Sequence, residues 1–156
     1  MPTTGFEALL RKRGLRVTAI RLAVLQSLEA APHAQADTVL ALVRQQLGTA
    51  SVQAVYDALH TLNEYELINT IEPAGHPARY ELRVGDNHHH LICTGCGRIQ
   101  DVDCSIGHAP CLAPSESHGF HVSVAEVNYW GLCQDCAQSR ESADLAPLPS
   151  STPEAI

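Results

Sequence analysis

Two pairs of cysteines carry the strongest chemical signal in this sequence. Cys93 and Cys96 form one Cys-x-x-Cys pair, Cys133 and Cys136 form another, and 36 residues separate the two pairs. Each pair can present two thiolates to one ion, and two pairs complete a tetrahedron. Two independent redox motifs are the alternative, but a redox pair usually opens a helix, whereas glycines flank Cys96. Four soft ligands with no open position therefore predict one structural Zn²⁺ site.

A second group of metal-binding residue types precedes the first cysteine pair. His88 and His90 are two residues apart in a predicted strand, so both imidazoles point to the same face. Glu81 and Asp101 add carboxylates nearby in the sequence, and His33 lies at a helix start in the first half. Mixed nitrogen and oxygen ligands suit iron, manganese or zinc. Each of these residues, taken alone, is more simply explained as an ordinary exposed polar side chain.

A third group lies at the start of a predicted helix that runs from Ser51 to Tyr65. Ser51, Gln53 and Tyr56 carry hydrogen-bond donors close to the first turn of this helix. The corresponding end of a recognition helix enters the major groove of DNA in helix-turn-helix proteins. The pattern is also that of an ordinary amphipathic helix, and the sequence of this helix alone does not separate the two interpretations.

The distribution of charge is compatible with DNA, although the net charge is −7. Residues 1–83 hold eight basic and eight acidic side chains, whereas residues 84–156 hold two basic and nine acidic ones. A neutral half with a basic leading segment can approach phosphate, and the acidic half suits cations. The basic residues of the leading segment are Arg11, Lys12, Arg13, Arg16 and Arg21.

The 156 residues suffice for one ordinary domain or two small ones. No apolar run approaches the roughly 20 residues of a membrane-spanning helix, so we expect no membrane partner. The first residues carry their charges after a short apolar stretch, which is the wrong order for a secretory signal. We therefore expect a cytoplasmic protein. In a reducing cytosol, six cysteines favour metal binding or redox chemistry over structural disulfides.

The elements that must position these groups can be predicted from periodicity. Apolar residues at helical spacing dominate the first half, with Thr18 as a predicted N-cap and Gly48 as a helix end. Two short strands around a Pro- and Gly-containing turn follow the helices, and this order is typical of a winged helix. The predicted helices cover residues 6–14, 18–28, 37–47 and 51–65, and the strands cover 67–71 and 79–82.

The second half is strand-like, so the predicted fold class is α+β. Strands are predicted at 88–93, 98–102 and 120–130, and Pro110 and Pro114 oppose a long helix before the last one. The last stretch is rich in Ser, Pro, Ala and Glu and has little to bury. The predicted organisation is a winged-helix domain at 1–83, a hinge at 84–87, a metal-binding domain at 88–137 and a disordered tail at 138–156.

These residues carry a resemblance to a known family over about residues 7–137. The chain resembles the ferric uptake regulator (Fur) family, in particular its actinobacterial members that control catalase genes and its peroxide-responsive members. The H-x-H-x-x-C-x-x-C-G run that begins at His88 is highly specific for this family. The other matching pieces are Gly14-Leu15-Arg16-Val17-Thr18, Gln53-Ala54-Val55-Tyr56, Arg79-Tyr80-Glu81-Leu82 and the final Cys-x-x-Cys.

The resemblance implies an N-terminal winged-helix DNA-binding domain, a hinge and a C-terminal α/β dimerisation domain that carries the four-cysteine zinc site. It implies a homodimer that binds a double-stranded DNA operator. It also implies a regulatory site for Fe²⁺ or Mn²⁺, with Zn²⁺ as a possible substitute. The family's regulatory ligands fall on His33, Glu81, His88, His90 and Asp101.

A further family site falls on His89, His108 and residue 125, which is alanine here. Alanine cannot bind a metal, so this additional site is altered or absent. The substitutes that we considered are His118, His121 and Glu126.

The chain departs from the family pattern in its DNA-facing segments. Ala19-Ile20-Arg21 stands where the family often has Pro, then Gln or Glu, then Arg. Asp57 follows the recognition tyrosine, where an arginine is common. The helix usual after the second metal strand is replaced by residues 104–114. The two differences in the DNA-facing segments predict a narrower or changed operator preference.

We expect a metal-dependent, peroxide-responsive repressor of oxidative-defence genes such as catalase, which binds a palindromic operator as a dimer. An ion that binds ligands from both halves would restrict their relative angle. Oxidation of His33 or His90, or a disulfide between Cys104 and Cys111, would relieve repression. Glu81 favours an alternative, the control of metal uptake genes, because the clearest peroxide-sensing relatives carry aspartate there.

Three other functions remain open at this point. Iron- or zinc-responsive control of metal uptake genes is the near alternative. A zinc-containing metalloenzyme is the alternative from another class, but no nucleophile or general base stands beside the ligands, so we expect no enzymatic activity. A zinc-stabilised interaction module would not bind an operator at all.

Overall fold

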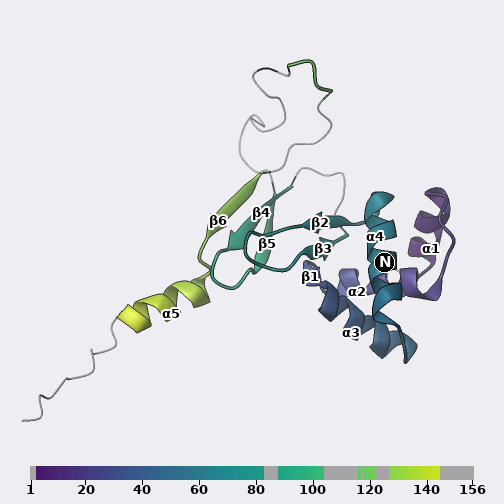
Figure 1. The fold of residues 1–156 in the computed structure, drawn as a ribbon, viewed down its shortest axis with the longest axis horizontal. Helices are drawn as coiled ribbons and strands as arrows, with labels where there is room; N and C mark the ends of the chain where they lie inside the picture. Colours follow the sequence, from purple (N-terminus) through teal and green to yellow (C-terminus); the bar gives the residue numbers. More distant parts are fainter. Residues whose placement is uncertain (1–2, 83–87, 104–115, 117, 122–126, 145–156) are drawn as a thin grey trace, which may run out of the picture. The chain divides into compact units, whose positions relative to one another are not determined.

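The computed structural model describes residues 3–82, 88–103, 116, 118–121 and 127–144 (Figure 1). The chain divides into two compact units, Met1–Asn87 and His88–Ile156. Both units combine helices with a small sheet, so the predicted mixed fold class is confirmed. Among the described residues, no helix has the length and apolar character needed to cross a membrane.

Four helices form most of the first unit, and their ends follow local capping rules. The Thr18 hydroxyl accepts a hydrogen bond from the Arg21 backbone N–H at 3.3 Å, and the Ser51 hydroxyl accepts one from Ala54 at 3.1 Å. Such N-caps satisfy backbone donors that the first helical turn leaves unpaired. Gly48 ends the third helix with φ of 77°, a conformation that glycine adopts without strain. The helices are α1 (Thr3–Lys12), α2 (Ala19–Ala30), α3 (Ala36–Leu47) and α4 (Val52–Glu64).

The first unit also contains a three-stranded antiparallel sheet with the order β1-β3-β2. The predicted hairpin corresponds to β2 (Asn69–Ile71) and β3 (Arg79–Glu81), whereas β1 (Ala34–Gln35) was not predicted. A strand of two residues is too short to show an alternating pattern, so sequence periodicity cannot reveal it. It forms because Ala34 and Gln35 pair with β3, directly after His33.

The core of the first unit lies between the four helices. Leu25, Val43, Leu59 and Leu62 are each at most 1% exposed, and they come from the apolar helix faces that the periodicity predicted. Ser27 is a buried polar residue between these helices. Its hydroxyl donates to the Ala23 carbonyl at 2.7 Å and accepts from Gln46 Nε2 of α3 at 3.1 Å. The helix-turn-helix arrangement is therefore held mainly by apolar packing.

The second unit is built around a three-stranded sheet with the order β5-β4-β6. The central strand pairs antiparallel with β5 and parallel with β6. In this register His90 lies between Asp101 on one side and Asn128 on the other. The elements are β4 (His88–Cys93), β5 (Ile99–Asp103), β6 (Asn128–Gly131) and α5 (Gln134–Asp144).

Two sequence expectations differ from the observed second unit. The predicted strand 120–130 is seen as β6, and residues 122–126 lie outside the described part of the chain. The predicted disordered tail was expected to begin at 138, but helix α5 continues to Asp144. The helix starts directly after Cys133, and Asp135 in its first turn pairs with Arg98 at 2.8 Å. The first turn of α5 thus contacts Arg98, just before β5, and the composition of the tail does not reveal this tertiary contact.

We expect Leu59→Ala to lower the free energy of unfolding by roughly 2–5 kcal/mol, because it opens a cavity in the helical core. Leu47→Ala is the matched control, since Leu47 lies in the neighbouring helix but is 37% exposed. Urea titration of the zinc-loaded full chain, followed by circular dichroism, measures both variants. Similar losses in the two variants would contradict the assignment of the core.

Candidate metal centres and nucleic-acid interface

The four predicted zinc ligands lie together in the second unit. The sulfur atoms of Cys93, Cys96, Cys133 and Cys136 are all within 4.8 Å of one another. Tetrahedral zinc with bonds of about 2.3 Å to sulfur requires sulfur atoms roughly 3.8 Å apart, and Cys96 Sγ lies 3.8 Å from Cys133 Sγ. The donor set and its spacing therefore suit a structural zinc ion.

The backbone around the cysteines favours negative charge on sulfur. The Cys133 N–H donates to Cys93 Sγ at 3.2 Å. Hydrogen bonds from the backbone of Cys133 and then Cys96 lower the pKa of Cys93 to about 6. The hydrogen bond of Cys136 with Cys133 raises the pKa of Cys136 to about 12, because the surrounding sulfur atoms compete for charge. The lower pKa of Cys93 means that it ionises before Cys136. A cation must displace the proton of Cys136, so metal binding weakens at low pH.

Gly95 permits the close approach of the two cysteine pairs. A Cβ atom at this position would lie 3.0 Å from Cys136 Sγ and 3.2 Å from Cys136 Cβ. Nearby, the backbone N–H of Thr94 donates to the Gly131 carbonyl at 2.7 Å. The turn after β4 is therefore fixed against β6, and the absence of a side chain at Gly95 is a packing requirement.

Three of the five predicted regulatory ligands converge in the second unit. The Nε2 atoms of His88 and His90 are 3.1 Å apart, which confirms that both imidazoles share one face of β4. Asp101 Oδ1 lies 3.6 Å from His90 Nε2 and 4.0 Å from His88 Nε2. Adjacent ligands of one ion with bonds near 2.1 Å lie roughly 3.0–3.4 Å apart. Small movements would therefore bring these three atoms onto one cation.

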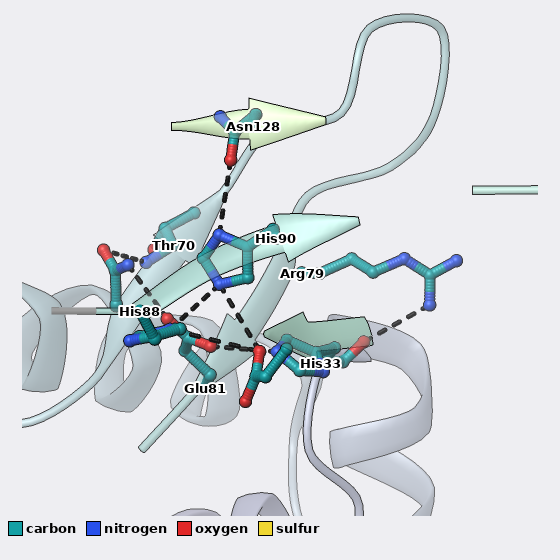
Figure 2. Close-up of polar contacts among 9 residues, drawn as sticks. His33, Thr70, Arg79, Glu81, His88, His90 and Asn128 are labelled. Atoms are coloured by element: carbon teal, nitrogen blue, oxygen red, sulfur yellow. Dashed lines mark hydrogen bonds and ion pairs between the residues drawn. The ribbon is translucent and has the colours of Figure 1, made fainter. Parts of the chain in front are cut away.

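The other two predicted regulatory ligands pair in the first unit. His33 Nε2 lies 2.9 Å from Glu81 Oε2, and Glu81 is 1% exposed (Figure 2). Asn69 Nδ2 donates to the second carboxylate oxygen, Oε1, at 3.1 Å. A buried carboxylate needs such partners, because an unpaired charge is costly in a low-dielectric interior.

His33 itself occupies an unusual backbone conformation. Its φ angle is 58°, in the left-handed region that side chains other than glycine seldom adopt. Arg79 Nη1 donates to the His33 carbonyl at 3.2 Å, as Figure 2 shows, and β1 begins at the next residue. The strand pairing and the arginine contact together hold this turn so that the imidazole faces Glu81.

Comparison with known proteins identifies the family to which a chain with these cysteine and histidine groups belongs. The model of the family described as "Ferric uptake regulator family" matches residues 12–130. The chain belongs to this family. "Transcriptional regulator FurA" of Mycobacterium tuberculosis is 53% identical over 133 residues, which cover 85% of this chain and 90% of FurA. The "Peroxide operon regulator" of Bacillus subtilis is 30% identical over 135 residues, 83% of this chain and 89% of that protein.

The solved structures show that the fold is that of known ferric uptake regulators. The Helicobacter pylori ferric uptake regulator Fur, described as having three functional metal binding sites, matches with a TM-score of 0.64 and 21% identity. The match covers 86% of this chain and 90% of that structure. The resemblance noted from the sequence is confirmed, and the chain is a metal-responsive transcriptional regulator of the Fur family. Its relatives are regulators and not enzymes, as we expected.

The additional metal site that the Fur resemblance suggested remains a prediction. His89 is 6% exposed, its ring packs edge-on against Tyr129, and within the described residues its Nδ1 atom has no hydrogen-bond partner. His118 and His121 are exposed. In the described part of the chain, no group of three or more ligand-type side chains includes His89. The remaining candidates, His108 and Glu126, and the redox candidates Cys104 and Cys111 lie outside the described residues.

Helix α4 presents the residues that we predicted to read DNA in this Fur-family member. Tyr56 is 42% exposed, and Gln53 Nε2 donates to Asp57 Oδ1 at 2.6 Å. Asp57 thus orients the amide of Gln53. Ser51 has a structural task as the N-cap of α4. Tyr56 and Gln53 therefore remain the better candidates for base contacts.

The basic segment at the start of the chain is partly engaged in local structure. Arg13 Nη1 donates to the Tyr65 carbonyl at 2.7 Å, next to the end of α4. Arg21 Nη1 donates to the Arg16 carbonyl at 2.8 Å. Arg11 pairs with Glu7 at 2.9 Å on the surface of α1, a contact of small energetic value. The contacts of these side chains and of Lys12 with phosphate remain predictions.

Sequence reasoning missed Asn69, Arg79 and Asn128 as residues of the candidate site. Each contacts a predicted ligand from a neighbouring strand or turn. Strand register is the signal that could have found the two asparagines, because residues directly opposite a ligand are its closest neighbours on an adjacent strand. Arg79 reaches the His33 carbonyl from a position opposite Gln35, so register does not identify it. A single sequence does not fix that register.

We expect Cys96→Ser to lose the tightly held zinc, because a hydroxyl replaces one of four thiolates. Cys104→Ser is the matched control, since Cys104 lies outside the two Cys-x-x-Cys pairs of the sequence. Metal analysis of the purified full chain after dialysis against a chelator measures zinc retention. Retention of zinc in Cys96→Ser, or its loss in both variants, would contradict this site.

Proposed function

We propose that this chain is a metal-dependent, peroxide-responsive repressor of oxidative-defence genes such as catalase. It acts in the cytoplasm, where it binds a palindromic operator in double-stranded DNA as a homodimer. Fe²⁺ or Mn²⁺ is the regulatory ion, with Zn²⁺ able to replace it, and Zn²⁺ fills the four-cysteine site.

The distribution of regulatory ligands over two units carries this proposal. The first unit, which holds the helices, supplies His33 and Glu81 at 2.9 Å. The second unit, which holds the cysteine cluster, supplies His88, His90 and Asp101 with ligand atoms 3.1 to 4.0 Å apart. Two ligands are too few for stable binding, and three leave open positions. One ion that uses both sets would complete its coordination and link the units.

Linking the units by an ion would make DNA affinity depend on metal. When the ion is bound, the relative orientation of the two units is already restricted before the protein binds DNA. When the ion is absent, the free-energy cost of restricting this orientation is taken from DNA binding, which lowers the apparent affinity for DNA. In a dimer, two α4 helices at a fixed spacing match the two halves of a palindromic operator.

The surface of the second unit supports its role in dimerisation. Leu91, Tyr129, Trp130 and Leu132 are 36–48% exposed around a cavity of about 320 Å³ next to β4 and β6. Clustered exposed apolar side chains of this size mark interaction surfaces. A second copy of the chain is the partner that a regulator of a palindromic operator requires.

Peroxide responsiveness follows from the chemistry of the ligands. Ferrous iron, when bound, supplies one-electron chemistry toward peroxide at the site. The oxidisable ligands of this chain that would face it are His33 and His90, one in each unit. Loss of either ligand would remove part of the link between the units. A disulfide between Cys104 and Cys111 is the other route.

Control of metal uptake genes is the second candidate function. The relatives named for ferric uptake regulation and Glu81, a longer carboxylate than the aspartate of the clearest peroxide sensors, favour it. Both candidates use the same ion-linked repressor and differ in the signal that removes the ion.

A gel shift separates these candidates. The probe is the DNA upstream of this gene and its neighbours, and the full chain is tested with Fe²⁺, Mn²⁺ or Zn²⁺, before and after peroxide. We expect metal to raise affinity and peroxide to reverse the iron-dependent shift, while the Mn²⁺ form persists. A shift that depends on metal and ignores peroxide would favour uptake control. DNA binding that changes with neither metal nor peroxide would contradict the proposal.

Mass spectrometry of the iron-loaded chain after peroxide identifies the sensing group. We expect a gain of one oxygen atom on His33 or His90, because both are proposed ligands of the ion. The Mn²⁺-loaded chain is the control and should stay unmodified. A Cys104–Cys111 disulfide with intact histidines would instead identify the thiol route.

A further inference from the structure

Two asparagines contact the proposed regulatory ligands from adjacent strands, one in each unit. Asn128 is the register partner of His90, and its Oδ1 lies 3.3 Å from His90 Nδ1 (Figure 2). Asn69 is the register partner of Glu81, and its Nδ2 lies 3.1 Å from Glu81 Oε1. Neither asparagine belongs to the ligand set, and each can fix the orientation of a ligand.

The Asn128 contact determines which nitrogen of His90 carries the proton. An amide oxygen only accepts, so the Nδ1 atom that faces it is the protonated nitrogen. Nε2 then keeps its lone pair. The 3.1 Å contact between the two Nε2 atoms agrees with this assignment, because His88 can donate to His90. His90 Nε2 also faces Asp101 at 3.6 Å, so the nitrogen left for a metal points toward the other ligands.

The two histidines therefore differ in their readiness for an ion. His90 already has the tautomer that a ligand at Nε2 needs. With the His90 proton on Nδ1, His88 donates from Nε2 to His90. This proton must move to Nδ1 or leave before His88 Nε2 can bind an ion. The asparagine contact thus makes His90 the preorganised ligand of the pair.

The amide of Asn69 is oriented by the backbone. The Thr70 N–H donates to Asn69 Oδ1 at 3.0 Å, which leaves Nδ2 as the end that faces Glu81. Glu81 is almost completely buried, so its oxygens depend on donors from the protein. With Oε1 held by the amide, Oε2 is the oxygen that faces His33 at 2.9 Å.

From these contacts we infer that Asn69 and Asn128 are positioning residues of the regulatory metal site. Asn128 holds His90 with its proton on Nδ1, so Nε2 binds the ion, and Asn69 reserves Glu81 Oε2 for the same ion. This inference rests on the proposed role of His90 and Glu81 as ligands. Groups that orient metal ligands in this way typically contribute roughly 10- to 100-fold to affinity.

The first experiment measures Mn²⁺ affinity of the zinc-loaded full chain by competition with a fluorescent chelator. Asn69→Leu and Asn128→Leu should each weaken binding by roughly 10- to 100-fold, with zinc content unchanged. Asn128→Asp keeps an acceptor for His90 Nδ1 and should restore the affinity.

Two matched controls test whether any asparagine or sheet amide would have the same effect. Asn63→Leu removes an amide whose oxygen accepts from the Thr70 hydroxyl at 3.0 Å. Thr70 is the residue that follows Asn69 in the chain. Gln100→Leu removes an amide from β5, in the sheet that also contains Asn128. Gln100 is the register partner of Leu91, the residue after His90. Both should bind Mn²⁺ like the wild type, and an equal loss in either would overturn the inference.

The second experiment reads the tautomer of His90 directly. Long-range ¹H–¹⁵N spectra of the zinc-loaded chain with ¹⁵N-labelled histidine show which ring nitrogen is protonated, and His90→Gln identifies the signals. We expect protonated Nδ1 in the wild type and in Asn128→Asp, and a shift of the proton toward Nε2 in Asn128→Leu. A merely structural asparagine would not change this pattern.

The outcomes separate the inference from the proposed function. A wild-type chain that binds no ion beyond the cysteine-held zinc would remove the proposed function. A wild-type chain that binds Mn²⁺ as tightly as both leucine variants, or that carries the His90 proton on Nε2, would overturn the inference alone.

Discussion

The register of β4 is the constraint on which both metal centres depend. Side chains two residues apart share a face of a strand, so His88 and His90 point together while Cys93 belongs to the alternate set. A slip of one residue would exchange the two faces and dismantle both ligand groups. The Cys133 N–H that donates to Cys93 Sγ and the Thr94 N–H that donates to Gly131 oppose such a slip. The cysteine cluster therefore also fixes the position of the histidines.

Burial of Glu81 imposes a second constraint, on the first unit. A carboxylate that is 1% exposed must be matched by donors or by a cation. Asn69 supplies one donor, and His33 faces the other oxygen from a strained backbone held by Arg79. Strain of this kind persists where surrounding contacts determine it, and it is concentrated at functional sites. The arrangement is costly as a purely structural device, and it is in keeping with the proposed role of His33 and Glu81 as cation ligands.

The sequence predicted the residue types and spacings better than the contacts between strands. Thr18 and Ser51 were identifiable as caps and the helices followed apolar periodicity, because these signals are local. The four cysteines were predictable because their spacing has few other chemical uses. Asn69, Arg79 and Asn128 were missed because their importance comes from register and from a turn at His33, which depend on residues far apart in the chain. The extension of α5 to Asp144 was missed because an anchored first turn is a tertiary effect.

The unequal division of ligands has a consequence for the proposed switch. The link between the units can be no stronger than the contribution of the smaller set, which consists of His33 and Glu81. Loss of a ligand from the larger set weakens metal binding but leaves two others beside the ion. Loss of His33 leaves Glu81 as the single contact from the first unit, and each tenfold loss in the coupling corresponds to about 1.4 kcal/mol. To reverse a two-state population from 1:99 to 99:1, an ion must bind the favoured state roughly 10⁴-fold more tightly than the other state. A link that depends on two side chains therefore cannot lose much binding free energy and still hold the units. Damage at His33 should therefore release the DNA-binding unit even where the ion itself stays bound to His88, His90 and Asp101.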